Sequence, residues 1–591
     1  MIIYSLNNKI ISCVENLFST HEIPVSKIQI VLTKKEFTGD ITLILFPLLS
    51  YIKKSPIEIG NLIGEKLLKN DEIESFNIVS GFLNLVLSDN YINNLFSSIY
   101  DDINFGIKAN DNNFSETTLV EFSSPNTNKP LHLGHIRNIL LGNSMSNILK
   151  KIGHNVTKVQ VINDRGIHIC KSMLAWLKFG NGETPEDANL KGDFFVGKYY
   201  ILFEQKFQEE KKDLIINGVS EEDVVNKSKL LLEAKEMLIK WENDDKEVRN
   251  LWKKMNNWVY SGFAKTYLDL GISFDKNYYE SETYLLGKNI IEKALQENIF
   301  FKKEDSSVWV DLSDYGLDQK LLLRSDGTAV YITQDIGTAI ERYNDFKLNN
   351  MIYVVGNEQD YHFSILFKIL KKLGYKWSEN CFHLSYGMVN LPDGRMKSRE
   401  GTIVDADTLI KKMRCDAKKI IKSSEKTDDF SSEEIDILSK KIGDAALKYF
   451  ILKVDSKKNM LFNPEESIDF NGNTGPFIQY CYARIKSLIM RKQKFKAHFK
   501  PHVKISFETK ELLKHVFEYP TILYDAGNLK NPSILANYTY QLAKLYNKFY
   551  QKIVILDGSK DEDYKLAISS KVADIIEDAM SLLGIEVPQK M

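Results

Sequence analysis

A strand, a helix and a second strand follow one another closely, and this order constrains the fold more than any other feature of the chain. Residues 117–122 (TTLVEF) have the apolar character of a buried strand. Residues 135–153 carry apolar side chains at helical spacing, and residues 156–164 (VTKVQVIND) return to a strand pattern. Such a βαβ unit implies a parallel sheet with the connecting helix packed on one face.

A second set of such units appears much later in the chain. Residues 350–356 read as a strand, 360–375 as a helix and 382–391 as a strand. The stretch between the two sets is charged and mostly helical in pattern, which predicts an insertion that divides one doubly wound sheet into halves. From about residue 435 the strand signals nearly vanish, and long amphipathic patterns such as residues 534–553 predict a helical bundle.

These patterns divide the chain into four parts. The N-terminal part mixes helical and strand-like segments and ends in a polar, Asn-rich linker candidate at residues 108–116. The expected fold is a Rossmann-like α/β domain with a helical insertion, preceded by an α+β domain and followed by an all-α bundle. The predicted boundaries are 1–105 for the N-terminal domain, 115–410 for the α/β domain (insertion approximately 180–285), 411–470 for a helical connecting segment and 471–591 for the C-terminal bundle.

Composition fits a globular protein without a membrane segment. Of the 591 residues 43% are hydrophobic and 27% charged, and the richest apolar run, residues 41–52, is too short to span a bilayer. The N-terminus lacks the clean apolar stretch of a signal peptide, so we expect a cytoplasmic protein. The five cysteines are scattered, which predicts neither a disulfide framework nor a protein-held metal site.

The net charge of -1 does not indicate a nucleic-acid partner, but the distribution of charge is uneven. Eight Lys or Arg residues and no acidic residue lie between Arg484 and Lys504. Such a stretch can neutralise phosphates. A solvated basic helix face is the alternative interpretation.

Two histidines stand three residues apart where the first predicted strand gives way to its helix. The segment His132-Leu133-Gly134-His135 lies where backbone N–H groups and the helix dipole favour phosphate. Gly134 has no side chain, so a flat base can approach the backbone closely. Both imidazoles can donate hydrogen bonds to one phosphate group and stabilise charge at phosphorus. A chance pair or a metal-binding pair is the alternative.

A basic segment flanked by glycines follows the strand at 382–391. Within residues 394–401 (GRMKSREG), Lys397 and Arg399 can reach triphosphate oxygens, and Arg395 can assist. A basic loop alone is usually a solvated turn. Its place in the second half of the same sheet as the histidine pair favours a shared phosphate site.

These segments together resemble a known family. HLGH resembles the HIGH signature of class I aminoacyl-tRNA synthetases, and RMKSR resembles their KMSKS loop. The surrounding residues are most similar to arginyl-tRNA synthetases, in the order SSPNTNKPLHLGHIRN, VINDRGIH, YITQDIG, VVGNEQDYHF and NGNTGPFIQYCYAR. The resemblance implies activation of L-arginine with ATP, followed by transfer to the terminal adenosine of tRNA(Arg). Mg²⁺ is expected to accompany ATP.

The resemblance also implies a set of ATP contacts and one departure from the family motif. In the KMSKS frame the second lysine falls at Ser398, and Lys129, just before the HIGH-like segment, is expected to take over that role beside the catalytic His132 and His135. Whether Lys397 or Arg399 shares the load stays open. The implied ATP-contacting residues are His132, Gly134, His135, His362, Met388, Arg395, Lys397, Ser398 and Arg399.

An arginine side chain requires a planar acceptor for its guanidinium group. Asp335 supplies one, and Tyr331 lies four residues earlier, on the same face of a helix. Glu121, at the end of the first strand, is a second acidic candidate. Without the resemblance, Asp335 and Tyr331 look like an ordinary surface pair. The resemblance implies further contacts to the substrate from Ser124, Asn126 and Gln359.

The two terminal domains resemble the tRNA-contacting domains of the same family. The N-terminal domain is implied to touch the outer corner of the tRNA, and the C-terminal bundle is implied to bind the anticodon. Arg484, Tyr540 and Tyr546 are the candidate tRNA contacts, with aromatic rings available to stack on bases. The helical spacing of the tyrosines equally suits core positions. A monomer is expected.

Three other interpretations compete with this one. A class I synthetase for another amino acid fits less well, because of the segment that holds Tyr331 and Asp335. A nucleotidyltransferase without an RNA substrate leaves the C-terminal bundle unexplained. A non-catalytic tRNA-binding relative predicts decay of the histidine pair or the basic loop, and only Ser398 departs. Because the loop is incomplete, we predict that arginine activation waits for tRNA.

Overall fold

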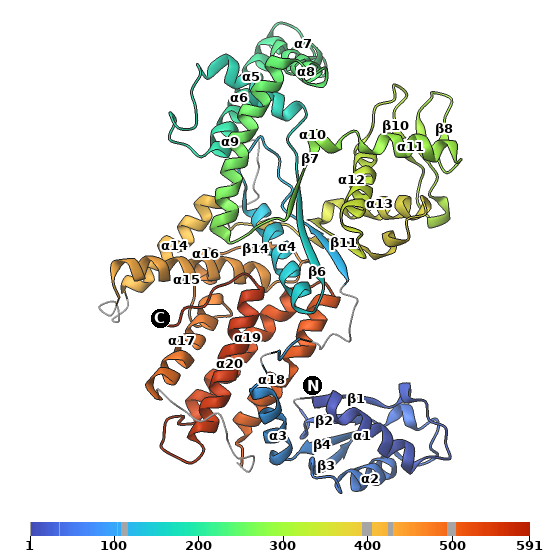
Figure 1. Cartoon of the computed structure of the whole chain (residues 1–591), viewed down its shortest axis with the longest axis vertical. Helices are drawn as coiled ribbons and strands as arrows, with labels where there is room; N and C mark the ends of the chain where they lie inside the picture. Colours follow the sequence, from blue (N-terminus) through green and yellow to red (C-terminus); the bar gives the residue numbers. More distant parts are fainter. Residues whose placement is uncertain are drawn as a thin grey trace.

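The computed structural model describes most of the chain. It covers residues 2–34, 36–102, 104–107, 116–392, 405–423, 430–492 and 504–591. Figure 1 shows the N-terminal domain in blue at one end, the sheet and its insertion in the upper half, and the C-terminal helices in orange and red. The linker candidate at 108–116 lies outside the described residues except for Glu116.

The central sheet has five parallel strands in the order β12-β11-β5-β6-β7. The chain enters at the middle strand, adds β6 and β7 on one side, and then adds β11 and β12 on the other. The order in which strands are added therefore reverses between β5 and β11, which makes this place the switch point of the sheet. In open α/β sheets, ligands bind at the carboxyl ends of the strands beside such a switch point. The strands are β5 (Thr117–Glu121), β6 (Asn155–Ile162), β7 (Lys276–Tyr279), β11 (Asn350–Gly356) and β12 (Cys381–Tyr386).

Helices cover both faces of this sheet. Leu119 and Met351 pack in one apolar cluster together with residues of α12 and α13, whereas Val120 and Ile352 pack in the other with residues of α4. This alternation follows from the two-residue period of a strand. The helices are α4 (Leu133–Lys151), α12 (Tyr331–Phe346) and α13 (Asp360–Lys372). The predicted Rossmann-like sheet is confirmed.

The helical insertion lies between β6 and β7 and rises above the sheet (Figure 1). It begins with α5, earlier than the predicted residue 180. Its helices are α5 (Ile167–Phe179), α6 (Gly192–Ile216), α7 (Val224–Lys227), α8 (Lys229–Glu242) and α9 (Lys246–Leu270).

A second addition lies between β7 and α12, and the sequence interpretation did not include it. It is a small antiparallel sheet in the order β10-β9-β8, preceded by two helices. Strands of two to four residues are too short to show an alternating pattern. The elements are α10 (Glu280–Thr283), α11 (Leu286–Gln296), β8 (Phe301–Lys302), β9 (Val308–Val310) and β10 (Lys320–Leu323).

The N-terminal domain is the expected α+β unit. Its antiparallel sheet has the order β1-β2-β4-β3, and Asp40 ties it to α18 through ion pairs with Lys510 and Lys514, each 3.0 Å. The elements are α1 (Ile2–Leu17), β1 (Gln29–Leu32), β2 (Ile41–Ile44), α2 (Pro56–Leu67), β3 (Ile73–Val79), β4 (Phe82–Leu87) and α3 (Asp89–Tyr100).

The remainder of the described chain is helical except for a two-stranded ribbon. None of the helices in the described part combines the length and apolar character needed to cross a bilayer. The elements are β13 (Val389–Asn390), α14 (Ala406–Ser423), α15 (Ser432–Leu452), β14 (Met460–Leu461), α16 (Pro464–Ser467), α17 (Gly475–Lys492), α18 (Phe507–Asn528), α19 (Ser533–Lys552) and α20 (Glu562–Leu582).

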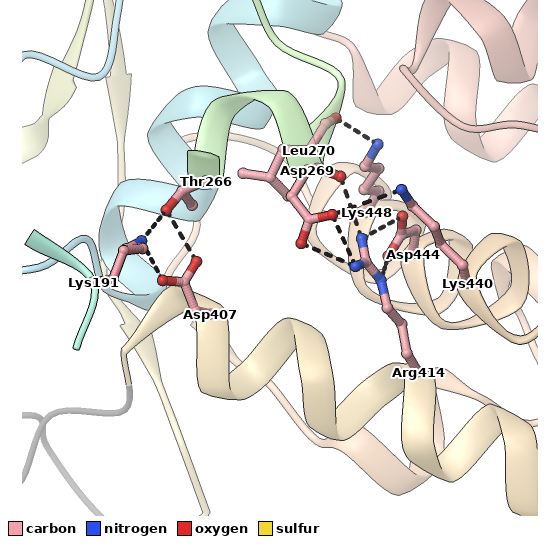
Figure 2. Close-up of polar contacts among 9 residues, drawn as sticks. All are labelled: Lys191, Thr266, Asp269, Leu270, Asp407, Arg414, Lys440, Asp444 and Lys448. Carbon is pink, nitrogen blue, oxygen red and sulfur yellow. Dashed lines mark hydrogen bonds and ion pairs between the residues drawn. The ribbon is translucent and has the colours of Figure 1, made fainter. Parts of the chain in front are cut away.

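Polar contacts join the end of insertion helix α9 to α14 and α15 (Figure 2). The Arg414 guanidinium donates to both carboxylate oxygens of Asp269, at 3.0 and 2.9 Å, and to both of Asp444, at 2.7 and 3.0 Å. Lys448 donates to the Leu270 carbonyl at 2.8 Å. Since α9 leads directly into β7, these contacts fix one edge of the sheet to the C-terminal helices.

Candidate active site

The histidine pair lies where the loop after β5 enters α4, at the carboxyl edge of the sheet. His132 is the N-cap, and its Nδ1 accepts a hydrogen bond from the Gly134 N–H at 3.2 Å. The His132 N–H donates to His135 Nδ1 at 3.1 Å. Because each Nδ1 is an acceptor, the proton of each neutral ring is assigned to Nε2. Both Nε2–H groups are then available as donors to a ligand.

Burial keeps these rings uncharged. It lowers the pKa of His132 to about 4, and the nearby Lys129 ammonium adds to the effect. Burial also holds the pKa of His135 well below its usual value, with His132 and Lys129 contributing. Burial lowers the pKa of Lys129 itself. At neutral pH the site therefore presents two uncharged N–H donors beside one lysine, which suits phosphate better than proton transfer.

Gly134 leaves room for the His132 ring over this turn. A Cβ on Gly134 would lie 3.0 Å from Cε1 of the His132 ring. The absence of a side chain thus lets His132 fold back over the first turn of α4. The two rings lie 3.9 Å apart, centroid to centroid.

Glu121 is already paired with a protein cation. Its Oε2 accepts from Nη1 of the buried Arg342 at 2.6 Å, and its Oε1 accepts from the Ser124 hydroxyl at 2.9 Å. Of the two predicted acceptors for a substrate guanidinium, Glu121 therefore has its charge matched within the protein. Its visible role is to fix Ser124 at the sheet edge.

Asp335 and His362 meet in the structure. His362 Nε2 lies 2.6 Å from Asp335 Oδ2, and this contact joins the second turn of α12 to the first turn of α13. Tyr331 opens α12 and is 80% exposed, and Gln359 is exposed at the start of α13. The structure thus brings Asp335, a predicted arginine contact, together with His362, a predicted ATP contact. Tyr331 lies on the exposed surface beside them.

The loop between β5 and α4 carries the other predicted substrate contacts. Ser123 and Ser124 have left-handed φ values of 71° and 45°, which non-glycine residues adopt rarely and often at ligand sites. Asn126 is exposed and pairs by a β-bridge with Asn163, after β6. Ser124 and Asn126 therefore lie at the carboxyl ends of β5 and β6.

The structure describes only the residues on either side of the basic segment. Arg395, Lys397, Ser398 and Arg399 lie outside them. Met388 precedes this segment and has 57% of its surface exposed. After it, His132 and Asp405 form a β-bridge, and the Ala406 N–H donates to the Leu131 carbonyl at 2.9 Å. The chain thus returns from the basic segment directly beside the histidine pair.

Two acidic residues near the site were not singled out from the sequence. Asp164 is buried after β6 and accepts from the Ser281 N–H, the Ser281 hydroxyl and the Tyr260 hydroxyl, each at 2.8 Å. Burial raises the pKa of Glu280, the residue after β7, to about 7; the Arg165 charge opposes this, and Asp164 and Asp335 add to it. Asp164 lies in the segment VINDRGIH, two residues after the end of β6. An acidic residue at the carboxyl end of a strand is the sequence feature that could have indicated it.

The three candidate tRNA contacts differ in how deeply the structure buries them. Arg484 lies half-buried between the rings of Tyr480 and Tyr550, 4.8 and 4.9 Å from their centroids. Tyr540 is half-buried beside Phe477. Tyr546 is 0% exposed and donates to Ser569 within the bundle, so its ring is not available to stack on a base. For Tyr546 the prediction is corrected: it is a core residue, because α19 packs this face against α20.

Comparisons with known proteins assign three parts of the chain to families. Residues 96–463 match the family described as tRNA synthetases class I (R), catalytic domain. Residues 478–591 match the DALR anticodon binding domain, and residues 4–87 match the arginyl tRNA synthetase N terminal domain. The sheet, the histidine pair at its switch point and this match together define a class I aminoacyl-tRNA synthetase catalytic domain.

Whole-chain relatives narrow the class to one family. The chain is 51% identical to the arginine--tRNA ligase of Flavobacterium psychrophilum and 49% identical to that of Bacteroides fragilis, with 99% of both chains covered in each case. It superposes on the Thermus thermophilus arginyl-tRNA synthetase with a TM-score of 0.80, at 22% identity and full coverage of both chains. The chain belongs to the arginyl-tRNA synthetase family. The fold class and the family predicted from the sequence are confirmed.

Proposed function

We propose that this chain activates L-arginine with ATP and transfers the arginyl group to the terminal adenosine of tRNA(Arg), using the site at the sheet's switch point. The observation that carries the proposal is the pair of neutral histidines whose Nδ1 atoms are engaged by the α4 N-terminus. This arrangement directs two N–H donors to a place where helix N–H groups already favour phosphate. Membership of the family supplies the reaction.

In the first step the arginine carboxylate attacks the α-phosphorus of ATP and pyrophosphate leaves. His132 and His135 donate from Nε2 to phosphate oxygens as charge develops, and Lys129 adds a positive charge beside them. Mg²⁺ would enter with the triphosphate. Among the described residues, no group of three or more His, Cys, Asp or Glu side chains is placed to hold a metal ion.

Asp335 is the proposed acceptor for the substrate guanidinium. It lies in the second turn of α12, with 42% of its side chain exposed, and Tyr331 lies one turn earlier. Ser124, held by Glu121, Asn126 and Gln359 are proposed to contact the other end of the amino acid. An uncharged amino acid would leave Asp335 without a cationic partner and bind poorly.

In the second step the terminal adenosine of tRNA accepts the arginyl group. We assign residues 471–591 to anticodon binding, which the match to an anticodon binding domain supports, and residues 1–105 to a further tRNA contact. Arg484 and Tyr540 remain the proposed contacts within the bundle. A cytoplasmic monomer is part of the same proposal.

The test is tRNA charging with each of the twenty amino acids supplied separately with ATP and Mg²⁺. Charging by arginine alone is expected, and charging by another amino acid would overturn the proposed pocket. Asp335→Asn should abolish most arginine charging. Asp345→Asn is the matched control, because Asp345 lies at the far end of the same helix and pairs with Lys276 and Tyr278.

A further inference from the structure

Arg137 stands two residues after His135 and is fully buried, with 0% of its surface exposed. Its guanidinium donates to backbone carbonyls of two segments far away in the sequence. On one segment the acceptors are Gly387 at 2.8 Å and Met388 at 3.4 Å. On the other they are Asp455 at 3.2 Å, Ser456 at 3.0 Å and Lys458 at 2.8 Å.

The two segments form one ribbon. The Gly387 N–H donates to the Ser456 carbonyl at 2.9 Å, and the Met460 N–H donates to the Met388 carbonyl at 2.9 Å. The Met388 N–H donates to Asn459 Oδ1 at 2.7 Å. Strands β13 and β14 continue the ribbon in parallel. Arg137 therefore fastens this whole ribbon to α4, the helix whose first turn carries the histidine pair.

The need to bind carbonyls of two segments at once explains why residue 137 is an arginine. Burying a guanidinium among carbonyls is costly, and burial lowers the pKa of Arg137 to about 10, although Tyr386 and Asp455 oppose the shift. The group still carries its charge at neutral pH. Lysine has three donors on a single nitrogen and cannot span two segments, whereas the planar fork of arginine can. A purely apolar contact would leave the five carbonyls without their shared donor.

We propose that Arg137 is a positioning residue for ATP: it sets the distance between the histidines on α4 and the backbone at Met388, two places where the family resemblance implies contacts to ATP. The inference rests on the proposed function and on the expected ATP contact at Met388. Arg137 touches neither substrate. It acts by holding the two halves of the nucleotide site at one spacing.

The experiment uses the full-length protein with Arg137→Lys. Pyrophosphate exchange is measured with arginine and tRNA saturating while ATP varies, and then with ATP saturating while arginine varies. The KM for ATP is expected to rise about tenfold, because hydrogen bonds from a charged donor are lost, while the KM for arginine stays within about twofold. Arg342→Lys is the matched variant of a buried arginine. It pairs with Glu121, so its expected effect is on the KM for arginine and not on that for ATP.

A second variant covers the case in which Arg137→Lys does not fold. Asn459 is exposed, and Asn459→Ala removes only the acceptor of the Met388 N–H. It should raise the KM for ATP in the same direction by a smaller factor. Equal rises in both KM values, or a lower kcat with an unchanged KM for ATP, would overturn the inference. Absence of arginine-dependent exchange in the unaltered protein would instead overturn the proposed function.

Discussion

At the scale of single residues, burial decides how the histidine pair works. The pKa of His132 lies near 4 and that of His135 is also far below the usual value, so both rings are neutral throughout the physiological range. Arginine activation should therefore show no inflection near the ordinary histidine pKa of about 6.5. The measurement is kcat for pyrophosphate exchange between about pH 5.5 and 8.5. An inflection near 6.5 that disappears in His132→Asn would contradict the neutral-donor role.

The same depressed pKa predicts a pH-dependent stability. Between about pH 4 and 6.5 the unfolded chain binds a proton at His132 that the folded chain does not. The contribution of neutral His132 is therefore fully present above the unfolded pKa and is lost as the pH falls toward 4. His132→Asn should flatten the dependence of the unfolding temperature on pH in this window. An unchanged slope would show that other groups dominate it.

Glu280 gives a prediction about the pH dependence of arginine binding. Its pKa is about 7, raised first by burial and further by Asp164 and Asp335, and opposed by Arg165. As the pH rises through 7, Glu280 gains a negative charge near Asp335, which favours a cationic substrate. The KM for arginine should fall a few-fold from pH 6 to 8, and Glu280→Gln should remove this trend. A trend that persists in the variant would place its origin elsewhere.

At the scale of elements, Arg414 in α14 links the end of the distant helix α9 to the neighbouring helix α15 (Figure 2). It pairs with Asp269 at the end of α9 and Asp444 in α15, with 18% of its side chain exposed. Arg414→Lys keeps the charge but loses the paired geometry. Amide hydrogen exchange in the last turn of α9 should speed up. Lys440→Met, which removes the more exposed 3.6 Å pair with the same Asp269, should change it little.

How much the sequence predicts also depends on the element. Residues 350–356 were expected as a strand and form β11 over the same residues, because a sustained apolar run fixes both type and bounds. The three strands between residues 301 and 323 were not expected, since each is too short to show a period. The candidate site divides in the same way. The HLGH segment was placed at a helix N-terminus by local pattern, whereas the pairing of Glu121 with Arg342, 221 residues later, left no local signal.

At the scale of the whole molecule, α4 connects the active site to the C-terminal bundle. Its N-terminus carries the histidines, and its other end contacts α20 through the Lys151–Asp578 ion pair at 2.8 Å. Gly527 in α18 packs so closely that a Cβ there would lie 2.4 Å from Ile152, just beyond α4. We therefore expect a change in the bundle on binding tRNA to reach the histidine pair through α4.

This connection supports the last prediction, that arginine activation depends on tRNA. Pyrophosphate exchange should be slow with ATP and arginine alone and should rise on adding tRNA(Arg). Lys151→Met removes the ion pair with Asp578 far from both substrates, so it should lower the stimulation by tRNA about fivefold while exchange without tRNA stays the same. Binding of tRNA, measured separately, is expected to change little, which would distinguish lost coupling from lost affinity. Exchange at full rate without tRNA would contradict the dependence itself. A full response to tRNA in Lys151→Met would instead show that the signal reaches the active site by another route, with the α9 contacts of Arg414 the next to examine.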